Sequence, residues 1–375
     1  YCLYYREYIL HIKFNFLHSE KAGNYFLLFF VLNFFNNEFT KGNNDNFVFM
    51  KILYAIQGTG NGHVSRAREI IPILKKYGML DILISGTQAD VNLNEEIKYQ
   101  FKGFGFDFGT NGGIDYKSSF RKADFRQLIK DIRNLPVKEY DLIINDFEPV
   151  TAWACMLRNK KSVALSHQSA FLSSKTPVIP GLHLGEIILK NYAPASHKIG
   201  FHFKRYDDFI KTPVIRSEIR ALFSENLEHY TVYLPAYSDE FILKKLEKFP
   251  EKTFQVFSKH TKEDYVKNHI EVFKINNEKF NQSLATSEGL LTGGGFEGPA
   301  EAMFLGKKVL CVPMFHQYEQ QCNALAAEEM GATVIWHEKE FDSKLKFWIE
   351  NANSIKVDFP DETEEIIKQL VANFV

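Results

Sequence analysis

The chain has 375 residues, of which 45% are hydrophobic and 24% charged, and its formal net charge is −1. This length is sufficient for two domains with hydrophobic cores of their own, and the near-neutral charge argues against a nucleic-acid-binding protein, which usually has a basic surface. The four cysteines form no Cys-x-x-Cys pair. Cys155 and Cys311 lie in apolar runs, which favours small core residues in a reducing, cytoplasmic setting.

Residues 1–49 differ from the rest of the chain. They begin with Tyr1 rather than Met, are crowded with Phe, Tyr and Asn, and show neither helix caps nor a clean period. We expect Met50 to be the natural start and residues 1–49 to be a non-native or disordered extension. The alternative is a membrane anchor through residues 25–35, but this run is only about half of the ~20 apolar residues that a spanning helix needs. The segment also lacks the small-residue cleavage site of a secretory signal.

After Met50, short apolar runs alternate with helical patterns, which is typical of parallel sheets with crossover helices. The first helix has an apolar stripe made by Ala67, Ile70, Ile71 and Leu74. We expect a polar passage at 206–229 to hold no strand and to connect two domains, 50–205 and 230–352, and residues 353–375 to pack back on the first domain through a helix at 363–374. The predicted fold class is α/β with two doubly wound parallel sheets. The expected strands are 51–56, 81–85, 99–108, 142–145, 162–166 and 198–203 in the first half, and 231–235, 254–257, 270–273, 289–291, 309–312 and 333–336 in the second.

A glycine-rich loop follows the first strand, with the sequence Gln57-Gly58-Thr59-Gly60-Asn61-Gly62-His63. Its spacing is not the G-x-G-x-x-G of a dinucleotide-binding loop, and the second strand ends without the acidic residue that would hold a ribose. NAD binding is therefore disfavoured. Ligands of such sheets bind at the carboxyl ends of the strands, where this loop lies.

The run from Leu290 to Ala302 is the most informative feature of the chain. A buried strand ends at Thr292, three glycines follow, and Pro299 sits where a helix begins, a position that suits proline. Glycines allow a ligand to approach the backbone closely, and free N–H groups at a helix start attract anions. This pattern predicts a phosphate-binding loop with Glu301 about one turn inside the helix. The alternative is a strand–turn–helix whose glycines serve packing alone.

The ordered motif continues with a strand that ends in Pro313 and a helix that carries Glu319, Gln320 and Asn323. Paired glycines, Glu-Ala, a strand ending in Pro, an acidic-Gln pair and Asn-Ala together resemble the donor-nucleotide signature of GT-B glycosyltransferases. The resemblance is to the UDP-glycosyltransferase superfamily and to the transferase that adds N-acetylglucosamine to lipid-linked muramyl peptide. It is strong over 289–332, moderate over 50–68 and architectural elsewhere. It implies two Rossmann-like domains that face a cleft.

The resemblance also assigns roles on the donor side. Backbone N–H groups of Gly293, Gly294, Gly295 and Phe296 would stabilise the diphosphate leaving group together with the helix dipole. Glu301 would accept hydrogen bonds from the ribose. The sugar hydroxyls would be read by Glu319 and Gln320, and Asn323 matches the Asn that follows this pair in the family.

The chain departs from the family pattern at two places. Gly293 replaces a His that contacts diphosphate, and Glu297-Gly298 replaces Asn-Ser. A carboxylate at Glu297 would repel phosphate unless it points away or meets a cation. We expect Lys259, which follows Ser258 at the end of a strand, to supply that charge; the alternative is a solvated surface lysine. No Asp-x-Asp run follows a strand, so no metal cofactor is predicted.

On the acceptor side, Gly60, Asn61 and Gly62 would face the cleft. His63 would take the proton of the attacking hydroxyl, since imidazole titrates near neutral pH. Asp146, at the end of the strand predicted at 142–145, would orient the imidazole ring. Alternatively, His63 binds backbone or an acceptor phosphate, and Asp146 caps the next helix. His167 is a second candidate for acceptor contact.

These residues predict a metal-independent inverting glycosyltransferase that moves a sugar from a nucleotide-diphosphate sugar, expected to be a UDP-sugar, to a hydroxyl. One base and no candidate covalent nucleophile favour direct displacement. The alternatives are a GT-B sugar-nucleotide epimerase and an inactive nucleotide-sugar-binding protein. The acceptor loops 109–122 and 169–185 carry no readable specificity. Apolar content near 171–189 permits a lipid-linked acceptor, hence peripheral contact with the inner face of the membrane.

Overall fold

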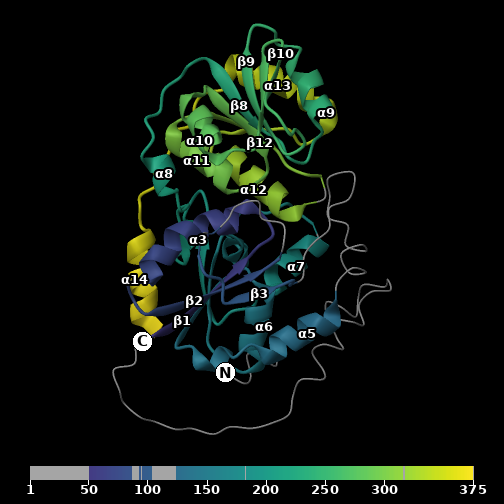
Figure 1. Cartoon of the computed structure of the whole chain (residues 1–375). Helices are drawn as coiled ribbons and strands as arrows, with labels where there is room; N and C mark the ends of the chain where they lie inside the picture. The colour runs from purple at the N-terminus through teal and green to yellow at the C-terminus, as the bar shows by residue number, and fades with distance from the viewer. Residues whose placement is uncertain are drawn as a thin grey trace, which may run out of the picture. The chain divides into compact units, whose positions relative to one another are not determined.

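The computed structural model describes residues 50–86, 93, 95–103, 124–181, 183–315 and 317–374 (Figure 1). The expectations for residues 1–49 and for the loop at 109–122 lie outside these residues. Within them the chain forms two sheets of seven strands each. We call each sheet with its helices a lobe, the first formed by the N-terminal half and the second by the C-terminal half.

The first sheet has the order β3-β2-β1-β4-β5-β6-β7, and all its neighbouring strands are parallel. β1 is an almost continuous apolar run in which residues 52–56 are fully buried, as expected for a parallel strand covered by helices on both faces. The strands are β1 (Lys51–Gln57), β2 (Met79–Ser85), β3 (Tyr99–Phe101), β4 (Leu142–Asp146), β5 (Val163–Ser166), β6 (His197–Phe201) and β7 (Ile210–Lys211). The helices are α3 (Asn61–Leu74), α5 (Phe125–Asn134), α6 (Pro149–Leu157) and α7 (Leu184–Asn191), with short 3-10 helices η1 (Val137–Glu139) and η2 (Gln168–Leu172).

The strand order reverses between β1 and β4. From β1 the chain proceeds to β2 on one side, and β4 adds on the other side with Ile56 opposite Asp146. Such a reversal leaves a crevice at the carboxyl ends of the two strands, where α/β proteins bind ligands. The loop that leads into α3 and the end of β4 therefore meet at one point.

The second sheet has the order β10-β11-β9-β8-β12-β13-β14 and is parallel except for the β10–β11 pair. It reverses between β8 and β12, so β12 delivers its glycine loop to the corresponding point of this lobe. The strands are β8 (His229–Tyr233), β9 (Thr253–Ser258), β10 (Tyr265–Lys267), β11 (Ile270–Lys274), β12 (Gly289–Gly293), β13 (Lys308–Val312) and β14 (Thr333–Val334). The helices are α9 (Asp239–Leu246), α10 (Asn277–Thr286), α11 (Glu297–Leu305), α12 (Tyr318–Glu329) and α13 (Phe341–Asn351), with the 3-10 helix η3 (Glu338–Glu340).

The predicted strands are found, and two expectations need correction. The strand expected at 99–108 ends at Phe101, and residues 104–110 lie outside the described part. The passage 206–229 was expected to hold no strand, which is wrong. It contains β7, which pairs with β6, and the short helix α8 (Ser217–Arg220). A two-residue strand anchored by one fully buried side chain, Ile210, is too short to produce a recognisable apolar run.

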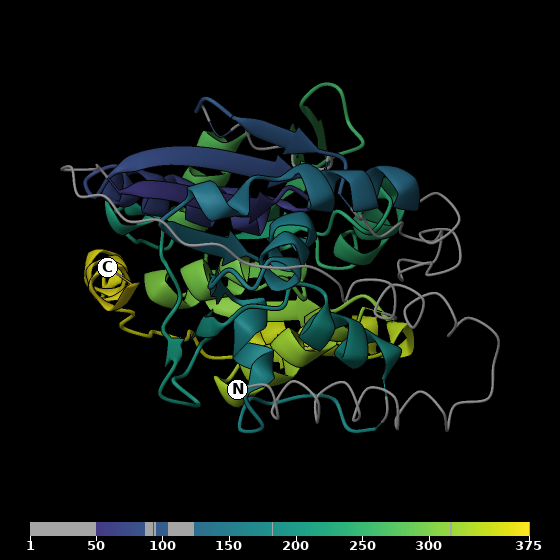
Figure 2. The same ribbon diagram turned by 90° about the horizontal axis from the view of Figure 1, so that it is seen from below.

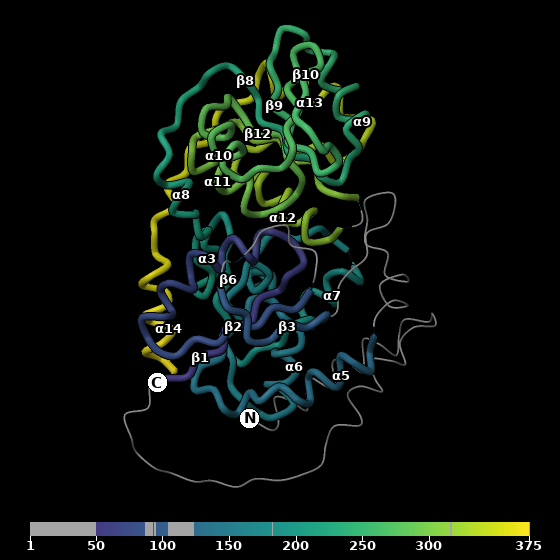
Figure 3. The backbone as a smooth tube through the Cα atoms, viewed as in Figure 1, coloured from purple at the N-terminus to yellow at the C-terminus, as the bar shows by residue number. Residues whose placement is uncertain are grey.

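The last helix, α14 (Thr363–Phe374), has the predicted bounds and lies against α3 of the first lobe. Its ends are fixed by an ion pair of 2.6 Å between Glu364 and Lys76 and by an edge-on ring contact between Phe374 and His197. Figures 1 and 2 show this helix, in yellow, beside the first sheet. The tube in Figure 3 follows the chain through α8 to β8 and back to α14.

Candidate active site

His63 and Asp146 meet where β1 and β4 end. His63 is the third residue of α3 and is buried, and its Nδ1 lies 2.7 Å from Oδ1 of the fully buried Asp146. A carboxylate only accepts hydrogen bonds, so Nδ1 carries the proton and donates it to Asp146. The lone pair of a neutral His63 is therefore on Nε2, the nitrogen that faces away from Asp146.

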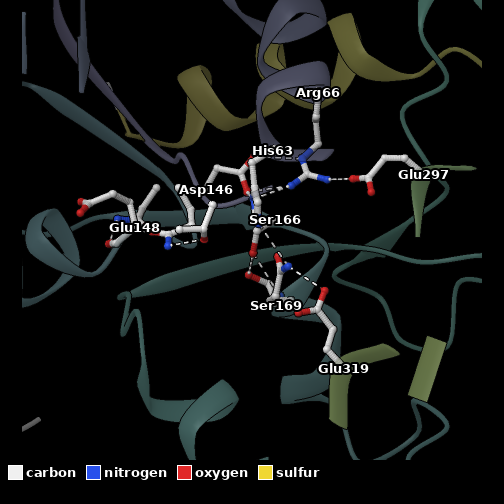
Figure 4. Close-up of polar contacts among 12 residues, drawn as sticks. His63, Arg66, Asp146, Glu148, Ser166, Ser169, Glu297 and Glu319 are labelled. Carbon is white, nitrogen blue, oxygen red and sulfur yellow. Dashed lines mark hydrogen bonds and ion pairs between the residues drawn. The ribbon is translucent and has the colours of Figure 1, made fainter. Parts of the chain in front are cut away.

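Arg66 is the main partner of Asp146 and was not foreseen from the sequence. Its Nη2 and Nε donate to the two carboxylate oxygens of Asp146 at 2.7 Å and 3.0 Å. The same guanidinium reaches the second lobe, where Nη1 donates to Glu297 Oε1 at 2.7 Å. Figure 4 shows Arg66 between the His63–Asp146 pair and Glu297. One buried cation thus joins the two lobes at the candidate base.

The charge of Asp146 is held by these neighbours. Burial alone would raise its pKa, but the attraction of Arg66 and His63 outweighs burial and lowers the pKa below its ordinary value. Asp146 therefore stays ionised and accepts the hydrogen bond from Nδ1 of His63. It does not cap α6, because that cap is Glu148, whose carboxylate accepts from the N–H groups of Val150 and Thr151.

Gln168 connects His63, the candidate base, to the second lobe. Its Nε2 lies 3.4 Å from His63 Nε2 and donates to Glu319 Oε1 at 2.9 Å. The candidate base and the carboxylate predicted to read the donor sugar are thus both within hydrogen-bond reach of one amide nitrogen. The other end of this buried amide, Oε1, has no hydrogen-bond partner among the described residues. Phe147, next to Asp146, is held at a φ of 57° with its ring parallel to that of His63, a strained backbone of the kind that collects at functional sites.

The glycine loop after β12 differs from residue to residue. Gly294 is buried, and a Cβ there would lie 2.6 Å from the carbonyl oxygen of Gln320. Gly295 is exposed, and a Cβ there would meet nothing within 4 Å. α11 follows, so its unpaired N–H groups and the positive end of its dipole lie beside this open glycine. This arrangement suits an anion.

Glu301 lies one turn inside α11 and is held by Arg216. Nε and Nη2 of Arg216 donate to its two carboxylate oxygens at 2.6 Å and 2.8 Å. The remaining donors of Arg216 go to Asn281, Asn277 and Glu218, which uses the whole guanidinium. Burial raises the pKa of Glu301 even though Arg216 opposes the effect. Arg216 lies in the passage expected to be only a connection, so sequence reasoning missed it.

His167, Asn323 and Phe296 form a second contact between the lobes. The His167 ring stacks on Phe296 at 3.8 Å, and its nitrogens lie 2.8 Å from the carbonyl oxygen of Phe201 and 2.7 Å from Asn323 Oδ1. Asn323 Nδ2 donates to the carbonyl oxygen of Gly294. Both His167 nitrogens thus have protein partners, which gives it a positioning role in this structure. Its predicted contact with the acceptor stays a prediction.

Gln320 and Ser258, both predicted on the donor side, are held by hydrogen bonds within the second lobe. Gln320 accepts from the Met314 N–H through Oε1. Ser258 donates to Asp239 and accepts from two backbone N–H groups of its own turn. A cation at Glu297 is Arg66, which was not foreseen; it is three residues after His63 and therefore on the same face of α3. The expectation that Lys259 offsets Glu297 stays a prediction.

Comparison with known proteins identifies the family. A family model described as glycosyl transferase family 1 matches residues 50–350. The chain belongs to this family. It is a glycosyltransferase. No curated protein sequence matches it.

Solved structures of low sequence identity share the GT-B fold of this family 1 enzyme. The glycotransferase of kitacinnamycin has 11% identity and a TM-score of 0.53 over 87% of this chain and 96% of that one. MurG of Acinetobacter baumannii has 12% identity and a TM-score of 0.52 over 86% and 99%. UGT2 of Phytolacca americana, solved with UDP-2-fluoro-glucose and pterostilbene, has 10% identity and a TM-score of 0.55 over 88% and 94%.

Among the residues that the structure describes, no three His, Cys, Asp or Glu side chains form a group that could hold a metal ion. None of the helices in the described ranges is both long and apolar enough to cross a membrane.

Proposed function

We propose that this glycosyltransferase transfers a sugar from a nucleotide-diphosphate sugar to a hydroxyl group by a single inverting displacement that needs no metal ion. The observation that carries the proposal is the position of His63. Its Nδ1 is bound to Asp146, and Arg66 ties this pair to the first turn of α11, directly after the open glycine loop. A base and an anion-binding helix start thus share one polar network.

The first lobe supplies the base in this proposal. The acceptor hydroxyl donates to His63 Nε2 in place of the long contact from Gln168. Its oxygen attacks the anomeric carbon while the bond from that carbon to the diphosphate oxygen breaks, and the proton passes to Nε2. Asp146 stabilises the resulting imidazolium and fixes the ring. A single attack from the opposite face inverts the anomeric centre.

The second lobe supplies the donor site. Backbone N–H groups of Gly294, Gly295 and Phe296 and the α11 dipole would stabilise the charge that develops on the leaving diphosphate. Because preorganised backbone donors provide this stabilisation, a metal ion is not required. Glu301, oriented by Arg216, would accept from the ribose, and Glu319 would accept from sugar hydroxyls once the Gln168 amide gives way.

A UDP-sugar is the proposed donor, because the likeness of the donor motif is to UDP-dependent enzymes and the similar Phytolacca structure was solved with a UDP-sugar analogue. A cytoplasmic location is proposed as well, and the free, buried thiols of Cys155, Cys311 and Cys322 support it. The proposed acceptor is a cell-envelope glycan or a lipid-linked sugar, with peripheral contact at the inner face of the membrane.

A thermal-shift panel of nucleotide sugars tests the donor. A ligand at a hundred times its dissociation constant stabilises the fold by about 2.7 kcal/mol, so the true donor should stand out. Transfer with this donor should continue in excess EDTA. The absence of a shift with every nucleotide sugar would refute the donor site, and loss of transfer in EDTA that returns with Mg²⁺ would refute metal independence.

The variant His63→Ala separates the proposal from its rivals. We expect transfer to collapse while UDP still binds. An epimerase would convert the sugar nucleotide without any acceptor, and an inactive binding protein would show no transfer even as wild type. Persistent transfer in His63→Ala would show that the base is another group.

A further inference from the structure

The ion pair between Arg66 and Glu297 is the most unusual contact of the donor site. Glu297 is in the first turn of α11, where the proposed function, on which this inference rests, places the diphosphate. A carboxylate here would repel that ligand. Yet the side chain of Glu297 is largely buried, with 29% exposed, and it is bound by a guanidinium that is 3% exposed.

Glu297 also fills the space beside Gly62, the second residue of α3. A Cβ on Gly62 would overlap the Glu297 carboxylate, with the Cδ atom only 2.7 Å away. The absence of a side chain at Gly62 thus lets the carboxylate lie directly against the first lobe. The Glu297 carboxylate, carried by α11 of the second lobe, therefore lies against both Gly62 and Arg66 of α3 in the first lobe.

One nitrogen of Arg66, Nη1, could exchange its Glu297 partner for a ligand. Nε and Nη2 are committed to Asp146, which is fully buried and belongs to the same lobe. Nη1 alone reaches across to Glu297. The single positive charge of Arg66 faces two carboxylates, Asp146 and Glu297. The cluster therefore has one negative charge in excess, which repels the diphosphate of an incoming donor.

We infer that Arg66 is a diphosphate-binding residue and that Glu297 is an internal anion that holds Nη1 until the donor displaces it. The donor then brings its phosphate oxygens to Nη1, and Glu297 turns toward solvent. A similar exchange would occur at Gln168, whose amide donates a hydrogen bond to the Glu319 carboxylate until a sugar hydroxyl replaces it. The proposed ligand is an anion that contains pyrophosphate. Removal of the Glu297 charge should therefore tighten ligand binding, whereas removal of an ordinary binding residue weakens it.

The test is calorimetric titration of the full chain with UDP and, separately, with inorganic pyrophosphate. Glu297→Gln removes the competing charge and keeps the shape, so the dissociation constant for both probes should fall at least fivefold. Glu278→Gln is the matched control: it removes the same charge from the first turn of α10 in the same lobe, where the side chain is exposed, and it should leave both constants within twofold.

Two further variants test the roles of Gly62 and Arg66 in this contact. Gly62→Ala should displace the carboxylate without removing its charge and tighten binding by a smaller factor. Arg66→Lys should weaken the binding of UDP and pyrophosphate at least tenfold. When Glu297→Gln is added to Arg66→Lys, the increase in affinity that Glu297→Gln causes in the wild type should no longer occur.

If UDP binds the wild type and Glu297→Gln matches Glu278→Gln or binds more weakly, the inference is overturned while the donor site stands. If no variant binds either probe, both fail.

Discussion

The two glycine-rich loops of this enzyme occupy equivalent places in the two lobes, yet they present different chemistry. Each follows a parallel strand at a point where the strand order reverses, and each leads into a helix. The loop after β1 delivers ionisable side chains, His63 and Arg66, to a buried carboxylate. The loop after β12 delivers backbone, with Gly295 open to solvent.

The difference supports the proposed division of labour between proton transfer in the first lobe and anion binding in the second. Side-chain chemistry needs an oriented, charged environment, which Asp146 and Arg66 provide. Anion binding needs only N–H groups at a helix start and room for the ligand to approach. If this division holds, changes at His63 and Asp146 should act on turnover, and changes in the second loop should act on donor affinity and on the stability of the second lobe. Arg66, which contacts both lobes, should affect donor affinity as well.

The largest effect is expected at Asp146. Asp146→Asn removes the negative charge that orients His63 and stabilises its protonated form, so kcat should fall by about 10²- to 10⁴-fold while the KM for the donor changes less than threefold. Steady-state kinetics measure both. The double variant with His63→Ala should lose no more than His63→Ala alone, because the two residues act as a unit. Additive losses would show that Asp146 acts independently of His63.

The next effect is on the second lobe, at the buried pair of Arg216 and Glu301. Arg216→Met leaves the carboxylate buried without its partner, which should lower the free energy of unfolding by about 3–5 kcal/mol in urea denaturation. Adding Glu301→Gln should restore part of this loss. A change below 1 kcal/mol would mean that Glu301 is not held by Arg216 in solution.

The sequence was sufficient for the features whose signals are local. Apolar runs located the strands, and the order of strand, three glycines and Pro299 predicted the loop and helix around Glu301. The pairing of His63 with Asp146 was foreseen from the likeness to GT-B enzymes, in which a His after the first strand is oriented by an Asp at the end of a later one.

Arg66 and Arg216 were missed because Glu297 and Glu301, the carboxylates that they bind, are 231 and 85 residues away in the sequence. The spacing of His63 and Arg66 on one face of α3 was the available signal. Nothing local distinguishes Arg216 from a solvated arginine in a polar passage, and β7 is too short to show a pattern.

A smaller effect separates two neighbouring glycines of the second loop. Gly294→Ala places a methyl group against the main chain of Gln320 and should cost about 1–3 kcal/mol of stability. Gly295→Ala meets open space and should stay within about 0.5 kcal/mol of the wild type. Urea denaturation measures both. Equal stability of the two variants would contradict the packing described for Gly294.

The smallest effect concerns pH and the histidines of the first lobe. Burial and the neighbouring His167 hold the pKa of His202 well below the ordinary value of about 6.5. The unfolded chain therefore binds a proton that the folded chain refuses, and stability should fall as the pH drops below about 6.5. In His202→Asn this slope should be shallower by about 1 kcal/mol per pH unit between pH 6 and 5. Parallel profiles would mean that His202 is charged in the native protein.

The most direct test of the division between the loops is calorimetric titration of His63→Ala and Gly295→Ala with UDP. We expect His63→Ala to bind UDP as the wild type does, since it changes only the proton acceptor. Gly295→Ala, folded normally, should bind at least tenfold more weakly, because its methyl group fills the space in front of the helix start. Wild-type affinity in Gly295→Ala, or lost affinity in His63→Ala, would contradict it.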